Sequence, residues 1–154
     1  MIAALVALAL AASPPAGDAA LKKELQATYD AYAQACVRQD LDAVMAMLTP
    51  DVQWTMADGS KLDRAGVEAS MRDFLKTLGP GSSARFAIRS LARKGDGVLV
   101  DVHLTVTLLQ PDPDHPGKKV KHVGRSGWHD LWVKGSGGWL NRTGEEYEVP
   151  PPKT

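Results

Sequence analysis

The chain has a single cysteine, Cys36, and no net charge. One cysteine excludes a disulfide within the chain, and the four histidines show none of the spacings typical of a zinc site. Eighteen basic residues balance eighteen acidic ones and are scattered along the sequence, which argues against nucleic acid as a partner. The composition therefore predicts no disulfide, no metal site, no cofactor and no nucleic-acid partner.

The sequence also lacks an apolar run long enough to span a membrane, which takes about 20 residues in a helix. Residues 2–12 are apolar, residues 13–15 read Ser-Pro-Pro, and small residues follow at Gly17 and Ala19. This pattern predicts a signal peptide over residues 1–19 and a periplasmic or secreted protein with no membrane span after cleavage. No Lys or Arg precedes the run, which leaves open that the segment stays as an anchor.

The first half of the mature chain has the periodicity of helices. Leu25, Tyr29, Tyr32 and Cys36 form one stripe of an amphipathic helix over residues 21–38. Asp40 is expected to cap a short helix over 41–48, and Asp63 a third helix that ends at Gly79-Pro80. A strand over 52–56 and a brief return at 61–62 lie between these two helices.

The second half has the alternation and turns of an antiparallel sheet, with strands expected over 84–93, 98–109, 120–134 and 139–149. We therefore predict an α+β fold in which three N-terminal helices pack on a curved antiparallel sheet. One domain over residues 20–149 accounts for the mature chain, and residues 150–154 form a proline-rich tail.

Two segments carry a family resemblance. Residues 40–54, DLDAVMAMLTPDVQW, and residues 130–139, DLWVKGSGGW, resemble the nuclear transport factor 2-like superfamily, in its SnoaL-like and ketosteroid-isomerase-like branches. The resemblance implies a cone-shaped sheet with an internal pocket and a homodimer formed through the outer sheet face. It does not fix the function, because this fold hosts enzymes of several kinds as well as proteins that only bind.

A histidine and an aspartate stand side by side at His129 and Asp130, as in an acid–base pair. In a strand, neighbouring side chains point to opposite faces, so these two cannot converge on one reacting atom. If the apolar residues of 98–106 share a face with Trp128, Asp130 and Trp132, that face is the concave one. His129 and His103 are then expected on the outer face, with Asp101 as the cross-strand partner of His129.

The resemblance implies roles for two side chains in the pocket. Tyr32 falls at the oxyanion-hole tyrosine of the ketosteroid-isomerase pattern and Asp130 at its protonated acid, so these are the candidate catalytic residues. A buried carboxyl with a raised pKa can donate a hydrogen bond to an oxyanion. Met56 falls at the position of the general base, however, and a thioether cannot accept a proton at neutral pH. This departure argues against steroid isomerisation.

Three functions remain open from the sequence. The first is an exported domain that binds a small apolar or aromatic molecule in an aromatic-lined pocket, with no assigned catalytic activity. The second is an isomerase, cyclase or dehydratase that uses Tyr32 and Asp130 as hydrogen-bond donors, and the third is a dimeric protein-interaction module with a filled cone. The residues expected to line the pocket are Tyr29, Tyr32, Trp54, Met56, Val100, Val102, Trp128, Asp130 and Trp132.

Overall fold

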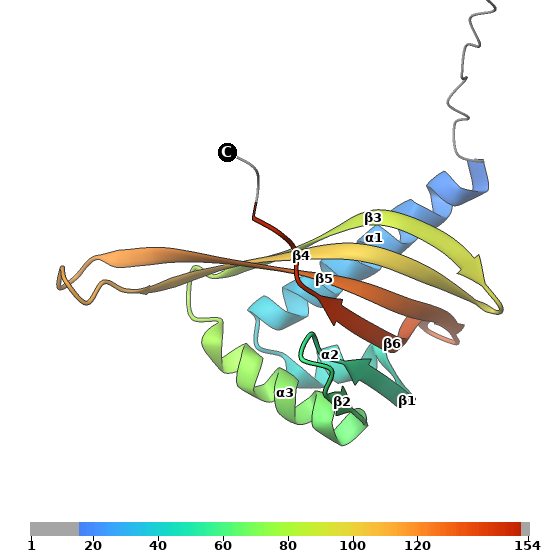
Figure 1. Cartoon of the computed structure of the whole chain (residues 1–154), viewed down its shortest axis with the longest axis horizontal. Helices are drawn as coiled ribbons and strands as arrows, with labels where there is room; N and C mark the ends of the chain where they lie inside the picture. Colours follow the sequence, from blue (N-terminus) through green and yellow to red (C-terminus); the bar gives the residue numbers. More distant parts are fainter. Residues whose placement is uncertain (1–15, 152–154) are drawn as a thin grey trace, which may run out of the picture.

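The computed structural model describes residues 16–151 and has the predicted α+β architecture, with the helices on one side of a curved sheet (Figure 1). Element order follows the sequence prediction, and most boundaries agree within a few residues. The helices are α1 (Ala16–Val37), α2 (Leu41–Ala46) and α3 (Arg64–Thr77). The strands are β1 (Leu48–Thr55), β2 (Lys61–Leu62), β3 (Ser83–Lys94), β4 (Gly97–Pro111), β5 (Lys119–Gly135) and β6 (Gly138–Tyr147).

Both predicted helix caps are present. The Asp40 carboxylate accepts a hydrogen bond from the backbone N–H of Ala43 at 3.0 Å, and the Asp63 carboxylate accepts one from Gly66 at 2.9 Å. Each bond satisfies one of the backbone donors that a helix leaves free in its first turn. β1 and β2 are joined by a turn at Asp58-Gly59, where Gly59 has a φ of 83° and the Asp58 carboxylate accepts a bond from the Ser60 backbone at 2.9 Å.

The six strands form one sheet in the order β2-β1-β6-β5-β4-β3. All neighbours are antiparallel except β1 and β6, which are parallel, and the sequence did not indicate this exception. The β4–β5 hairpin extends past the rest of the sheet (Figure 1), since β3 pairs with β4 only as far as Thr107 and β6 pairs with β5 only as far as Gly127. This projecting part has a cavity-facing side and a solvent-facing side.

The predicted split between the two faces of the sheet is confirmed by the β4–β5 register. Val100 pairs with Asp130 and Val102 with Trp128, so these four share the concave face. Asp101 pairs with His129 on the outer face, where the His129 Nε2 lies 3.9 Å from a carboxylate oxygen of Asp101. The His-Asp sequence at 129–130 is therefore divided between two surfaces.

Helix α1 is held against the sheet by side-chain bonds to backbone groups. Gln26 donates to the carbonyl of Phe86 at 2.8 Å and accepts from the backbone N–H of Ile88 at 3.3 Å, which ties α1 to β3. At the other end of the helix, Gln39 donates to the carbonyls of Leu75 and Leu78 at the end of α3. These contacts fix both helices over the concave face and leave a cavity between them.

The predicted signal peptide falls mostly on residues 1–15, which lie outside the described residues, and residues 16–19 belong to α1. Among residues 16–151, no helix is both long enough and apolar enough to cross a bilayer.

Candidate functional site

A cavity of about 630 Å³ opens between α1, α3 and the concave face of the sheet. Its volume lies in the range of small-molecule sites, roughly 300–1,000 Å³. Most of its wall is apolar and aromatic, with contributions from the second half of α3 and from the β4–β5 hairpin. The polar side chains that reach it include Tyr29, Tyr32, Ser126, Asp130, Asn141, Glu146 and His122.

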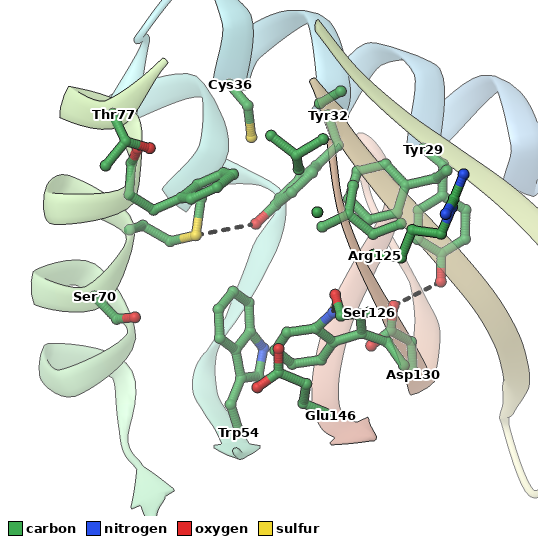
Figure 2. A pocket seen from close by; sticks show the side chains of 18 of the residues that line it. Tyr29, Tyr32, Cys36, Trp54, Ser70, Thr77, Arg125, Ser126, Asp130 and Glu146 are labelled. Carbon is green, nitrogen blue, oxygen red and sulfur yellow. Dashed lines mark hydrogen bonds between the residues drawn. The ribbon is translucent and has the colours of Figure 1, made fainter. Parts of the chain in front are cut away.

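A chain of three side chains crosses from the sheet to α1 at Asp130. The indole N–H of Trp132 donates to the Tyr29 hydroxyl at 2.8 Å, and that hydroxyl donates to the Asp130 carboxyl at 2.6 Å (Figure 2). Tyr29 is 1% exposed and Asp130 is 7% exposed. Each of these three side chains thus has a hydrogen-bond partner inside the protein, as buried polar groups require.

Burial controls the protonation of this group. Desolvation raises the pKa of Asp130 from 3.8 to about 7, although the hydrogen bond from Tyr29 and the nearby Asn141 amide both favour the charged form. Burial, and next the Asp130 charge, hold the pKa of Tyr29 well above its usual range. Asp130 therefore exists near neutral pH both as an acid that donates a hydrogen bond and as a carboxylate that accepts one.

Gly144 makes room for the carboxyl. It pairs with Asp130 on β5 and with Trp54 on β1, so it lies between them. A Cβ at this position would lie 3.0 Å from an Asp130 oxygen, 3.1 Å from Trp54 and 3.2 Å from Trp128. The side chains of the neighbouring strands fill the space that a side chain at residue 144 would take.

Tyr32 does not hydrogen-bond to Asp130, the other candidate catalytic residue. Its hydroxyl points to α3 and donates to the Met71 sulfur at 3.7 Å, while its ring packs edge-on against Phe86. Residues three apart on a helix differ in direction by about 60°, because each residue turns the helix by about 100°. The side of α1 that faces β5 carries Tyr29, and Tyr32 lines the cavity nearer α3 (Figure 2).

Seven of the nine residues expected in the pocket line this cavity, and Val100 and Val102 do not. Both valines are on the concave face, as predicted, but each is 0% exposed because the packed core covers that part of the sheet. Cys36 also lines the cavity, and burial raises the pKa of its thiol to about 12, which disfavours the reactive thiolate.

Glu146 is a carboxylate at the cavity that the sequence analysis did not predict. It pairs with Trp128 on β5 and lines the cavity, with its carboxylate accepting a bond from the Ala57 backbone at 3.3 Å. A bulge shifts the pairing of β5 and β6: Trp132 faces Asn141, whereas Asp130, two residues away, faces Gly144. Simple alternation along β6 therefore fails to place its side chains, and the site holds a second carboxylate near Asp130.

Met56 stands at the cavity wall where the family pattern has its base, and it supplies no proton acceptor. Asp58 lies exposed in the turn, where hydrogen bonds from Ser60 lower its pKa. Among residues 16–151, no group of three His, Cys, Asp or Glu side chains is arranged to hold a metal ion.

Comparisons with known proteins agree with this architecture. A family model for the SnoaL-like domain matches residues 29–139. None of the curated proteins matches the sequence. Solved structures share the fold at low identity. One is a candidate scytalone dehydratase from Novosphingobium aromaticivorans, with a TM-score of 0.67, 13% identity and coverage of 86% of this chain and 91% of that one.

Two further solved structures share the fold at similarly low identity. A candidate dehydratase of the nuclear transport factor 2-like family from Streptomyces avermitilis has a TM-score of 0.65 and 17% identity. The match covers 86% of this chain and 97% of that one. A nuclear transport factor 2-like protein with a cystatin-like fold, also from Novosphingobium aromaticivorans, has a TM-score of 0.63, 14% identity and coverage of 90% and 92%. The family match spans well over half of the sequence, so the chain belongs to the SnoaL-like family, with a nuclear transport factor 2-like fold.

Proposed function

We propose that the chain binds one small apolar or aromatic molecule in its cavity, with an oxygen of the ligand against Asp130. The observation that carries this proposal is an open cavity of about 630 Å³ that has an apolar wall and reaches a buried carboxyl. An interaction module with a filled cone fits this observation poorly. The apolar wall would supply most of the binding free energy, and the polar group would fix the ligand's orientation.

Asp130 suits a ligand that carries a carbonyl or a hydroxyl group. With a pKa of about 7, the protonated form donates to a carbonyl oxygen, and the ionised form accepts from a hydroxyl. Tyr29 already donates to one carboxyl oxygen, so the ligand would contact the carboxyl at the other oxygen, beside the Asn141 amide. Tyr32 borders the same cavity but its hydroxyl is engaged by Met71, so we expect a smaller contribution from it.

A thermal-shift screen of aromatic ketones and phenols on the full chain tests the proposal. A ligand that stabilises the wild type should bind about tenfold more weakly to Asp130→Asn, because the ligand loses a hydrogen bond to an acidic group. Tyr32→Phe should weaken ligand binding by a smaller factor. Asp101→Asn, on the outer face, is the matched control and should bind like the wild type. Ligand stabilisation that survives Asp130→Asn unchanged would remove Asp130 from the site.

A second candidate function is acid–base catalysis, and the presence of Glu146 in the cavity favours it. Asp130 and Glu146 are diagonal neighbours on adjacent strands, which separates their Cβ atoms by about 7–8 Å. A ligand carbonyl could accept a hydrogen bond from protonated Asp130 while Glu146 removes a proton from the adjacent carbon. The enolate would then be reprotonated at carbon by the same glutamic acid. Two of the similar structures are described as candidate dehydratases.

Hydrogen exchange at carbon measures this step without knowledge of the natural substrate. We expect the chain to accelerate deuterium uptake at the carbon next to the carbonyl of 1-tetralone in D₂O, followed by NMR. Glu146→Gln should abolish the acceleration, and Asp130→Asn should reduce it by about tenfold or more. If 1-tetralone takes up deuterium no faster with the wild type than in buffer alone, the catalytic function is excluded and only the binding function remains.

A further inference from the structure

One corner of the cavity combines two indole rings with a carboxylate: Trp54, Trp128 and Glu146, called here the indole–carboxylate corner. Glu146 is the cross-strand partner of Trp128, and Trp54 pairs with Gly144, two residues from Glu146 on β6. Directly opposed residues on one face of a sheet have Cβ atoms about 5 Å apart. Figure 2 shows Trp54 and Glu146 from the cavity, away from the bond between Tyr29 and Asp130.

The two indole rings line the cavity, and the protein itself uses their polar N–H groups. The N–H of Trp54 donates to the Asn141 side chain at 3.1 Å, and the N–H of Trp128 donates to the Ser126 hydroxyl at 3.1 Å. The ring centroids are 5.2 Å apart at an interplanar angle of 60°. Because both N–H groups are satisfied by the protein, what the rings offer a ligand is apolar surface with a negative π face.

The carboxylate of this corner has no positive partner. Glu146 forms no ion pair within residues 16–151, and the only hydrogen bond that its side chain makes there comes from the Ala57 backbone. The basic side chains that border the cavity belong to Arg125 and His122, which precede Trp128 on β5 by three and six residues. At about 3.3 Å per residue they lie roughly 10 and 20 Å along the strand.

We propose that the ligand of this cavity is a cation: an organic amine whose ammonium group sits in the indole–carboxylate corner and whose apolar body follows the cavity wall. This inference rests on the proposed binding function and specifies the class of ligand. An ammonium group over the face of one of these indole rings gains a cation–π attraction, which grows when water is excluded. It also donates a charge-assisted hydrogen bond to Glu146, which neutral ligands of the same shape cannot match.

Two probes of the same length separate the charge from the apolar body. We would measure the Kd of 4-phenylbutylamine and of 4-phenylbutan-1-ol on the full chain by calorimetry at neutral pH. The amine should bind about tenfold more tightly than the alcohol. Glu146→Gln should bring the two affinities together while the alcohol binds as before. Glu145→Gln is the matched control, since Glu145 is the exposed neighbour on the outer face and carries the same charge.

The results with the two probes separate failure of the cation proposal from failure of the proposed binding function. Equal affinity of the wild type for both probes would overturn the cation proposal and leave the binding site intact. Because that comparison needs no variant, a folding defect in Glu146→Gln would not obscure it. An equal loss of preference in Glu145→Gln and Glu146→Gln would also overturn the proposal, since it would reflect net charge alone. Failure of both probes to bind would count against the binding function and the inference together.

Discussion

Each face of the sheet carries an aspartate that is bonded to a tyrosine, and the two pairs differ in burial. On the concave face, Tyr29 donates to Asp130 at 2.6 Å, and both side chains are buried. On the outer face, Tyr147 donates to Asp101 at 2.5 Å, and its ring stacks on His129 with centroids 4.7 Å apart. The outer pair is partly open to solvent.

The comparison shows that surroundings, more than residue type, decide what a carboxyl can do. Water solvates part of the outer pair, so its bond adds modestly to stability. On the concave face, desolvation raises the pKa of Asp130 to about 7. The same two residue types therefore give a surface contact on one face and a titrating group in a cavity on the other.

Of the changes that distinguish the two faces, replacing Asp130 should have the largest effect on the free energy of unfolding. Because the pKa of Asp130 rises on folding from 3.8 to about 7, the folded chain binds this proton more tightly than the unfolded chain. Stability should therefore fall as pH rises from about 4 to about 7, by at most roughly 4 kcal/mol, and then level off. Asp130→Asn should remove this part of the pH dependence of the free energy of unfolding, measured in urea.

The control for this prediction is Asp101→Asn. It removes the carboxyl of the outer pair and should leave the fall in stability between pH 4 and pH 7 in place. An identical pH profile for the wild type and Asp130→Asn would show that the buried carboxyl does not titrate in this range.

Removing either tyrosine hydroxyl should lower the free energy of unfolding by a smaller amount, and the loss should be larger for Tyr29 than for Tyr147. Tyr29→Phe leaves the Trp132 N–H and the Asp130 carboxyl without their shared partner in the core, which should cost about 1–3 kcal/mol of unfolding free energy. Tyr147→Phe leaves Asp101 accessible to water and should cost less than about 1 kcal/mol. Urea denaturation of both variants measures the difference. Equal losses would mean that the two pairs are equally solvated.

Much of the fold could be predicted from the sequence, because it depends on local signals. Periodicity, the capping residues Asp40 and Asp63 and the turn glycines set the elements and their order. Strand alternation separated His129 from Asp130, and the apolar pattern of β4 oriented the concave face. Each of these signals acts between residues close in sequence or between paired strands.

The details of the site could not be predicted in the same way. Tyr29 and Tyr32 lie on one apolar stripe of α1, so the sequence does not distinguish them. Which of the two tyrosines bonds to Asp130 depends on how α1 crosses the sheet. Glu146 was hidden by the bulge between β5 and β6, which shifts the face that each residue of β6 occupies. Val100 and Val102 share the predicted face, yet the depth of the core keeps them from the cavity. These features depend on tertiary packing.

A smaller loss of stability than that of Tyr29→Phe is expected at Gly144 and Gly127, two glycines that each leave space for side chains on one face of the sheet. Gly144→Ala puts a methyl group 3.0–3.2 Å from Asp130, Trp54 and Trp128, which cannot move freely, so we expect a loss of about 1 kcal/mol and weaker ligand binding. Gly127→Ala puts one 2.1 Å from the Tyr147 ring, which can swing into solvent near the end of β6. That variant should lose the bond to Asp101 and keep ligand binding unchanged. Calorimetric titration of both variants tests the contrast, and weaker binding by Gly127→Ala would mean that the two faces are coupled through β5.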